Sequence, residues 1–427
     1  MDYPTWFDVI AIGSVAVVAF MLFLALFEPG LAYKVEPTDS CDLDSPDFLR
    51  MIEALTDAQL RRTCSVEVLT NGEVYYEAEL EAISRARSSV NLEAYIFQKG
   101  EAAGRFVKAL AGRARAGVKV KLVLDAAGSF ASWNSYFREL TDAGGRVEWY
   151  HALRWHNWTR YNNRTHRELI VVDGRVGFIG GSGVADHWLK PRDGKRRWRD
   201  TMFRVEGELV LSLQATFAEN WLEASGEILA GEEYFPNIEA GDDTSAFVVN
   251  SSPTTGGSTR ARILFQMLLA SARESILITT PYFLPDRSAR REMARAVKGR
   301  GVRMEIITPG VHSDHLLTRT SSRRLYGDLL KAGAHIYEYQ PGMIHAKTMV
   351  VDGAWSVVGT TNFDNRSFGL NDEVNLAAFD RPLAARVGED FARDRAESRE
   401  ITYEEWRARP LWERAYEQLG HILERQQ

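Results

Sequence analysis

The hydrophobic pattern changes character along the chain. Residues 6–27 are apolar throughout apart from Asp8, and as a helix they would extend roughly 33 Å, enough to cross a bilayer core of about 30 Å. From Val66 onward, amphipathic helical stretches alternate with short apolar runs, which is typical of an α/β fold with buried strands. The pattern therefore predicts a transmembrane helix followed by an α/β body.

The α/β pattern occurs twice in the same order. The first copy is predicted to contain helices at 75–86, 102–116 and 133–143, and strands at 90–97, 118–124 and 146–150. The second copy is predicted to contain helices at 260–272, 287–299 and 321–332, and strands at 275–280, 303–308 and 335–339. This internal duplication predicts two pseudo-symmetric α/β/α sandwich halves packed against each other.

The duplication divides the chain into predicted regions. These are a transmembrane anchor (1–30), a connector helix region (31–65), a first half (66–238), a linker rich in Gly, Ser, Thr and Asp (239–257), and a second half (258–427). The connector helix is expected from Pro46 to about Arg62, with Asp44 or Ser45 as its cap.

An apolar stripe marks the C-terminal tail, residues 403–423. It consists of Trp412, Tyr416, Leu419 and Leu423. The stripe predicts a helix docked on the second half, with a partner-binding helix as the alternative.

The N-terminal apolar segment reads as an uncleaved anchor. A secretory signal peptide would need a positive start and a small-residue cleavage site, whereas no Lys or Arg precedes Lys34, and Glu28-Pro29-Gly30 follows the apolar run. Lys34 and the arginines at 50, 61 and 62 follow the segment, so the positive-inside rule places the larger part of the chain in the cytoplasm.

Two related motifs carry the candidate chemistry. The downstream motif runs from His345 through Lys347 to Asp352 and is followed by Gly359-Thr360-Thr361-Asn362; the upstream motif runs from His166 through Glu168 to Asp173 and is followed by Gly180-Gly181-Ser182-Gly183. On a buried strand, His345 and Lys347 would share one face. An imidazole beside a fixed cation suits phosphoryl chemistry.

Composition limits the other functions. With 427 residues, 45% of them hydrophobic, the chain can form one large core or two medium ones. A net charge of −6 gives no global basic field for nucleic acid. The two cysteines, Cys41 and Cys64, lie far from the histidine motifs, which argues against a zinc site and leaves a single disulfide as an alternative.

The paired motifs resemble the phospholipase D superfamily, whose signature, His-x-Lys-x4-Asp, is used twice. Within it, the second half is similar to bacterial cardiolipin synthases. The resemblance is carried by residues 282–286 (YFLPD), 321–333 (SSRRLYGDLLKAG), 336–339 (IYEY) and 362–367 (NFDNRS). It covers roughly residues 75 to 425 and is stronger in the second half.

The resemblance implies a mechanism without metal or cofactor. His166 and His345 would act from opposite sides of one phosphate as nucleophile and general acid, and family precedent leans toward His166 as the nucleophile. Transfer would pass through a covalent phospho-histidine. Lys347 and Asn362 would hold the non-bridging oxygens, where negative charge accumulates.

Four carboxylates are assigned to support the site. The resemblance places Glu373 and Asp200 as the acids that hydrogen-bond the imidazoles and fix their tautomers. Asp173 and Asp352 lie an odd number of residues beyond their histidines, so on regular strands they would face away. They are predicted to form structural ion pairs.

The upstream motif departs from the family at two positions. Glu168 replaces the motif lysine, and Gly183 stands where the family often has Asn. A carboxylate about 4 Å from a phosphate oxygen would repel it by roughly 4 kcal/mol at an effective dielectric of about 20. The first of three interpretations is that a cation neutralises Glu168. The candidate cations are Arg160, Arg164, Lys195, Arg196 and Arg197. The other two are a lipid-binding protein with little catalysis, and a contact from Glu168 to the hydroxyl of an acceptor alcohol.

Two segments mix aromatic and basic residues around the first motif. They are residues 155–164 (WHNWTRYNNR) and 190–199 (KPRDGKRRWR). Their composition suits a bilayer interface or single-stranded nucleic acid, and the anchor favours lipid.

The sequence thus predicts a single-pass enzyme of the bacterial inner membrane that makes cardiolipin from phosphatidylglycerol. The alternatives are a hydrolase or nuclease of the same fold, or a catalytically weak lipid-binding homologue. The predicted partners are a phospholipid and the membrane, with no prediction of oligomeric state.

Overall fold

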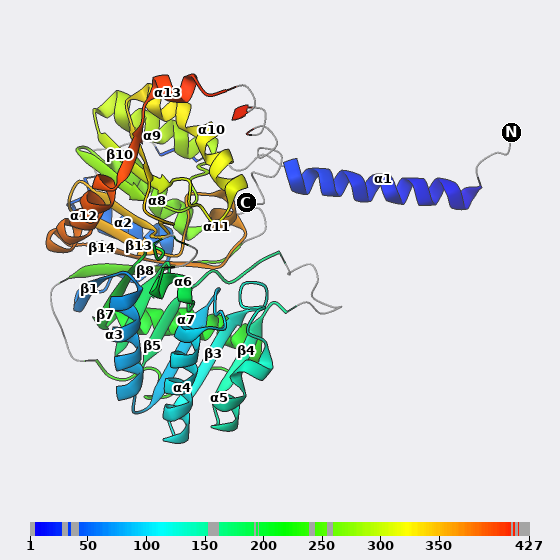
Figure 1. Ribbon diagram of the computed structural model, residues 1–427, viewed down its shortest axis with the longest axis vertical. Helices are drawn as coiled ribbons and strands as arrows, with labels where there is room; N and C mark the ends of the chain where they lie inside the picture. Colours follow the sequence, from blue (N-terminus) through cyan, green and yellow to red (C-terminus); the bar gives the residue numbers. More distant parts are fainter. Residues whose placement is uncertain are drawn as a thin grey trace.

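The computed structural model describes most of the chain. The described residues are 5–27, 33–35, 42–152, 162–191, 194, 196–238, 244–253, 259–410, 413–414 and 417. They form two α/β halves, one above the other in Figure 1, each built on its own mixed sheet.

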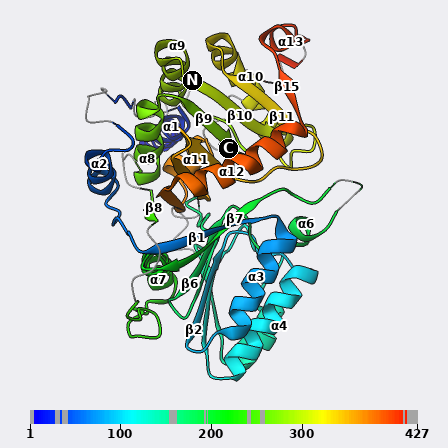
Figure 2. The same cartoon turned by 90° about the vertical axis from the view of Figure 1, so that its left-hand side faces the viewer.

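The first half contains a seven-stranded sheet in the order β1-β7-β6-β5-β2-β3-β4. Its strands are β1 (Cys64–Thr70), β2 (Ser89–Ala94), β3 (Lys119–Asp125), β4 (Arg146–Tyr150), β5 (Leu169–Val172), β6 (Val176–Gly180) and β7 (Thr201–Gly207). Its helices are α3 (Gly72–Arg85), α4 (Glu101–Arg115), η1 (Asn134–Phe137), α5 (Arg138–Asp142), α6 (Asp186–Leu189) and α7 (Leu209–Ser225). Figure 2 shows α3 and α4 on one face of this sheet and α7 on the other.

The second half contains an eight-stranded sheet in the order β15-β11-β10-β9-β12-β13-β14-β8. Its strands are β8 (Ser245–Ser251), β9 (Ser275–Thr279), β10 (Arg303–Pro309), β11 (His335–Tyr339), β12 (Thr348–Val351), β13 (Trp355–Gly359), β14 (Glu373–Phe379) and β15 (Ser398–Ile401). Its helices are α8 (Arg260–Ser271), α9 (Arg287–Arg300), α10 (Leu316–Ala332), α11 (Asn365–Gly369), α12 (Arg381–Ala396) and α13 (Tyr403–Arg407).

The two sheets share one strand order, apart from the extra edge strand β15. In each half, three parallel strands (β2-β3-β4 and β9-β10-β11) adjoin a run of antiparallel strands. The predicted two-half α/β architecture is confirmed. The carboxyl ends of parallel strands are where α/β folds commonly place their sites, so the duplication produces two such edges.

A hydrophobic core joins the halves. It combines Ile179 and Val205 of the first sheet with Val358 and Leu376 of the second, all buried. Buried apolar surface of this kind gives the interface the character of a protein interior and fixes one half against the other.

The connector helix is α2 (Pro46–Thr56), which ends before the predicted Arg62. The Ser45 side chain caps it by accepting the amide of Phe48 at 3.1 Å. Asp57 then adopts a left-handed conformation with φ of 51°, which ends the helix. Phe48 packs edge-on against Trp355 of the second half, at 5.6 Å between ring centroids.

The N-terminal apolar segment forms α1 (Trp6–Phe27), which extends away from the body (Figure 1). Its side chains are described only as far as Phe20. Across the described part of the chain, none of the helices combines the length and apolar character needed to cross a membrane. The single-span anchor therefore stays a prediction.

Two other predictions fall partly outside the described residues. The apolar stripe at positions 412, 416, 419 and 423 lies outside the described residues. Cys64 is a buried free thiol that donates to the carbonyl of Thr244 at 2.9 Å, whereas Cys41 lies outside the described residues.

Candidate active site

The two motif histidines lie in extended segments that lead into strands. β5 begins at Leu169 and β12 at Thr348, so His166, His345 and Lys347 precede the strands, and the prediction that they lie within a strand is wrong. Lys347 nonetheless lies on the same side as His345, with 3.3 Å between its Nζ and the imidazole Nε2.

Backbone hydrogen bonds tie each histidine to the opposite half. The amide of His166 donates to the carbonyl of Asp372 at 2.9 Å, and the amide of His345 donates to the carbonyl of Arg199 at 2.7 Å. The carboxylate-bearing residues Glu373 and Asp200 directly follow these two acceptors in sequence. The backbone pairing therefore brings each acid to the histidine of the other half.

The side chains complete this crossed arrangement. His166 Nδ1 lies 3.0 Å from Glu373 Oε1, and His345 Nδ1 lies 2.9 Å from Asp200 Oδ2. Both carboxylates are fully buried. An ionised carboxylate can only accept a hydrogen bond, so each Nδ1 carries a proton and Nε2 is the ring nitrogen that the carboxylate does not engage.

Burial and charge set the protonation of the His345 pair. Burial would raise the pKa of Asp200, but its hydrogen bond with His345 and the charge of Lys347 together hold that pKa below its ordinary value. Burial lowers the pKa of His345, and Lys347 lowers it further, against the opposing effect of Asp200. The pair therefore consists of a neutral imidazole and an ionised carboxylate.

Lys347 fits its site because glycine stands opposite. A side-chain carbon at Gly181 would lie 3.1 Å from Lys347 Nζ and 2.8 Å from Asp200 Oδ1. Burial lowers the pKa of Lys347, while Asp200, Glu373 and Glu168 raise it, and burial prevails.

Asn362 is buried beside the downstream motif. Its Oδ1 accepts no hydrogen bond from the described residues. Such an unused polar group suits contact with a ligand.

The described cation candidates do not neutralise Glu168. Arg164 pairs with Asp125, Arg196 with Glu397 and Arg197 with Glu73. The remaining candidates, at positions 160 and 195, lie outside the described residues.

Glu168 turns instead to the backbone. Its Oε1 accepts the amides of Tyr95 and Ile96, both at 3.1 Å. Burial raises its pKa well above the ordinary value, against the opposing effects of the Ile96 amide and Lys347. The environment thus favours the neutral acid, and a neutral carboxyl does not repel a phosphate.

Glu168 and Gly183 form one coupled arrangement. A side-chain carbon at Gly183 would lie 2.8 Å from Glu168 Oε1 and 2.3 Å from the carbonyl of Ile96. The Tyr95–Ile96 backbone therefore occupies the space that an Asn side chain would need. The two departures from the family pattern therefore lie against the same stretch of backbone.

Asp173 and Asp352 form the same turn in each half, each with φ near 50°. The Asp173 carboxylate accepts the amides of residues 87–89, and the Asp352 carboxylate accepts those of residues 273–275. The prediction that these two residues form ion pairs is wrong, because both carboxylates bind backbone amides instead. Each aspartate follows the end of its strand, whereas the histidine precedes the start, and its carboxylate anchors the start of the neighbouring strand through backbone amides.

Sequence reasoning missed a tyrosine beside each histidine. The Tyr95 ring stands edge-on to His166 at 5.2 Å between centroids, and the Tyr282 ring stands at 6.4 Å from His345. Their position just after the first parallel strand of each half was the available signal.

Comparison with known proteins fixes the family. A family model described as "Cardiolipin synthase, PLD-like domain" matches residues 80–221 and 265–395. The chain belongs to this family. The class predicted from sequence, a phosphatidyltransferase or phosphodiesterase of the phospholipase D superfamily, is confirmed.

Curated relatives agree with the family model. The chain is 35% identical to the major cardiolipin synthase ClsA of Bacillus subtilis over 89% of this chain and 79% of that one. It is 34% identical to the cardiolipin synthase of Oceanobacillus iheyensis over 84% and 74% of the two chains.

A solved structure shares the fold. Phosphatidylserine synthase of Haemophilus influenzae aligns with a TM-score of 0.68, and the alignment covers 89% of the present chain and 99% of the synthase chain. At 16% identity, this match concerns the fold alone.

The contacts of Glu168 generate a test of its role. Glu168→Gln keeps an oxygen for both amides, so turnover and thermal stability should stay close to those of the unmodified protein. Glu168→Lys leaves two buried amides unpaired and places an ammonium near Lys347, which should cost about 2–5 kcal/mol of folding stability and lower turnover at least about tenfold. Thermal unfolding and lipid turnover measure both effects; faster turnover by Glu168→Lys would contradict the arrangement.

The electrostatics of His345 generate a second test. Lys347→Met removes one of the two effects that lower the pKa of His345, so the imidazole should become protonated at a higher pH than in the unmodified protein. Nuclear magnetic resonance of ring-labelled histidine measures this shift, with the exposed His335 as the internal reference. An unchanged or lower His345 pKa would show that Lys347 does not act on the ring.

Proposed function

We propose that this protein makes cardiolipin from two molecules of phosphatidylglycerol through a covalent phospho-histidine, without a metal. The observation that carries the proposal is the crossed pair of histidine–carboxylate contacts, which engages both Nδ1 atoms and leaves the two Nε2 atoms to act on a phosphate, that of His345 beside Lys347. The names of the curated relatives supply the product, cardiolipin, and phosphatidylglycerol as the donor is part of the proposal.

The reaction balances with these groups alone. One Nε2 attacks phosphorus, the bond to the glycerol headgroup oxygen breaks, and the other imidazole, as imidazolium, protonates that oxygen, releasing glycerol. A hydroxyl of a second phosphatidylglycerol then attacks the phospho-histidine and gives its proton back to the second imidazole. Cardiolipin forms and the enzyme is restored.

The remaining groups hold the phosphate. Lys347 and Asn362 of the second half would bind the non-bridging oxygens as charge accumulates. The first half supplies neither cation nor amide side chain at the matching positions, so the charge would be held asymmetrically. Asp200 and Glu373 would keep both rings in the correct tautomer.

The neutral state of His345 in the free protein suits attack, whereas the family resemblance favours His166 as the nucleophile. Mapping the covalent adduct distinguishes these assignments. We further propose that α1 anchors the chain in the bacterial inner membrane, with the two halves in the cytoplasm, where phosphatidylglycerol is present in the adjoining leaflet.

Turnover of phosphatidylglycerol tests the proposal. Full-length protein in mixed micelles with EDTA should yield cardiolipin and glycerol, detected by mass spectrometry. His345→Ala should abolish the product, and Asp200→Asn and Glu373→Gln should each reduce turnover about 10²- to 10⁴-fold because the tautomers are no longer fixed. His335→Ala, a histidine on the protein surface, serves as the matched control and should be fully active.

Other outcomes of this experiment would point to a different reaction or to no reaction. Phosphatidic acid alone would indicate a hydrolase, and dependence on added metal would contradict the mechanism. Lipid binding without any product would indicate a non-catalytic homologue.

A further inference from the structure

Exposed apolar side chains gather on two corresponding loops. The first loop, residues 126–133, follows β3 and exposes Phe130 by 74% and Trp133 by 50%. The second, residues 310–316, follows β10 and ends at the first residue of α10; it exposes Val311 by 58% and Leu316 by 65%. We call these the β3 loop and the β10 loop.

Each loop is tied to one of the motif histidines. In the β3 loop, the Ser129 hydroxyl donates to the carbonyl of Tyr95 at 2.9 Å, and the Tyr95 ring stands against His166. In the β10 loop, Asp314 accepts the Tyr282 hydroxyl at 2.6 Å, and the Tyr282 ring faces His345. The two loops therefore border the active site, one from each half.

The exposed tryptophan is held in place by other aromatic rings. Trp133 stacks on Trp149 with 4.6 Å between centroids, and Trp149 packs against Phe137 at 6.2 Å. A supported aromatic side chain loses little conformational freedom when it is buried. Tryptophan is also the residue that favours the headgroup level of a bilayer.

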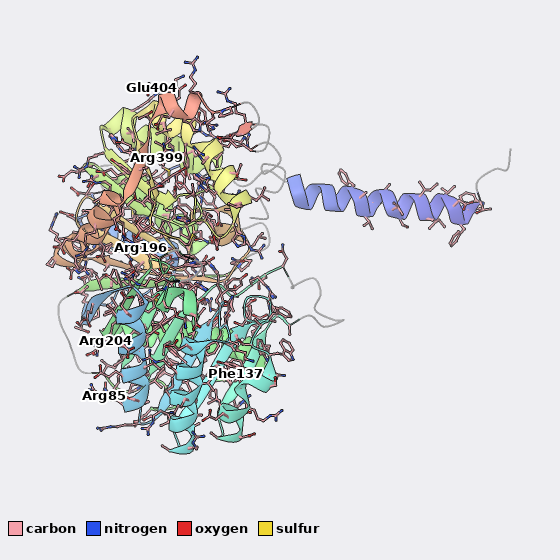
Figure 3. The ribbon with its side chains drawn as sticks, viewed as in Figure 1. Arg85, Phe137, Arg196, Arg204, Arg399 and Glu404 are labelled. Atoms are coloured by element: carbon pink, nitrogen blue, oxygen red, sulfur yellow. The ribbon has the colours of Figure 1, made fainter. Side chains whose placement is uncertain are left out.

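The aromatic cluster of the first half lies on the side of the body from which α1 extends. Figure 3 shows Phe137 on the side of the body from which α1 extends, and Arg85 and Arg204 on the opposite side. Those two arginines form surface ion pairs with Glu81 and Glu206. Phe137 is itself buried, but it packs against Trp149, on which the exposed Trp133 stacks, so this aromatic cluster lies toward the same side as the apolar helix.

We propose that the β3 and β10 loops together form a membrane-docking surface, which inserts Phe130, Trp133, Val311 and Leu316 among the lipid headgroups. The occupant is the surface of a phospholipid bilayer, and the inference rests on the proposed phospholipid substrate. A phosphodiester in a bilayer lies at headgroup depth. Loops that insert there from both sides of the site bring the two imidazoles to that depth, so the substrate need not leave the bilayer.

A kinetic comparison tests the surface in the full-length protein. Phe130→Ser combined with Leu316→Ser should raise the apparent KM for phosphatidylglycerol vesicles about tenfold. The same variant should leave kcat/KM unchanged for a short-chain phosphatidylglycerol below its critical micelle concentration, because a dissolved substrate needs no docking. The matched control is Leu55→Ser combined with Ile228→Ser, two exposed apolar residues outside the loops, and it should leave both values unchanged.

Two kinetic outcomes would overturn the proposal. Equal losses on vesicles and on dissolved lipid would show that the loops only support the fold. An unchanged KM on vesicles would show that they do not dock.

A second measurement is independent of turnover. Vesicles of phosphatidylglycerol with brominated acyl chains should quench tryptophan fluorescence, and Trp133→Phe should remove part of that quenching, whereas Trp355→Phe, in the buried core, should not. Equal quenching with and without Trp133 would overturn docking. Quenching by Trp133 in a protein that makes no product would support docking and contradict the proposed function instead.

Discussion

The candidate active site depends on two contacts between the halves, in which each half supplies the carboxylate that binds the motif histidine of the other. Glu373 of the second half binds His166 of the first, and Asp200 of the first half binds His345 of the second. Neither motif histidine takes its carboxylate partner from its own half. The chemistry therefore requires an interface that holds the halves in register to within the length of a hydrogen bond.

Several buried features meet this requirement. The shared hydrophobic core fixes the sheets against each other, and the backbone pairing at both histidines sets the register at the site. Arg199, whose carbonyl accepts the His345 amide, also forms a buried ion pair with Asp394 of α12 at 2.9 Å. Removing one member of such a pair leaves an uncompensated buried charge, so the interface is specified by charge as well as by packing.

The symmetry of the halves is broken at the positions proposed to bind phosphate. The second half keeps Lys347 and Asn362, whereas the first has Glu168 and Gly183 locked onto the Tyr95–Ile96 backbone. With one phosphate bound between the halves, as proposed, only one half needs to supply a cation. The other side is free to become structural, and its loop still borders the site through Tyr95.

Local sequence patterns predicted much of the fold, because strands and helices follow short-range periodicity. β4 and β11 run over the predicted residues, and the duplicated order of elements was correct. The end of α2 was missed because it depends on the left-handed conformation of Asp57. The partner of Glu168 was missed for a different reason: backbone amides distant in sequence leave no side-chain signal. The residues of the crossed pairs were named from the family resemblance, but the crossing itself arises only when the halves pack.

The most direct test of one site shared by two halves is the stoichiometry of the covalent intermediate. Protein mixed rapidly with phosphatidylglycerol, quenched in denaturant at mildly alkaline pH and analysed intact by mass spectrometry should carry at most one phosphatidyl group per chain, on a single motif histidine. Two groups per chain, one on each histidine, would show that the halves act as separate sites and would contradict the account.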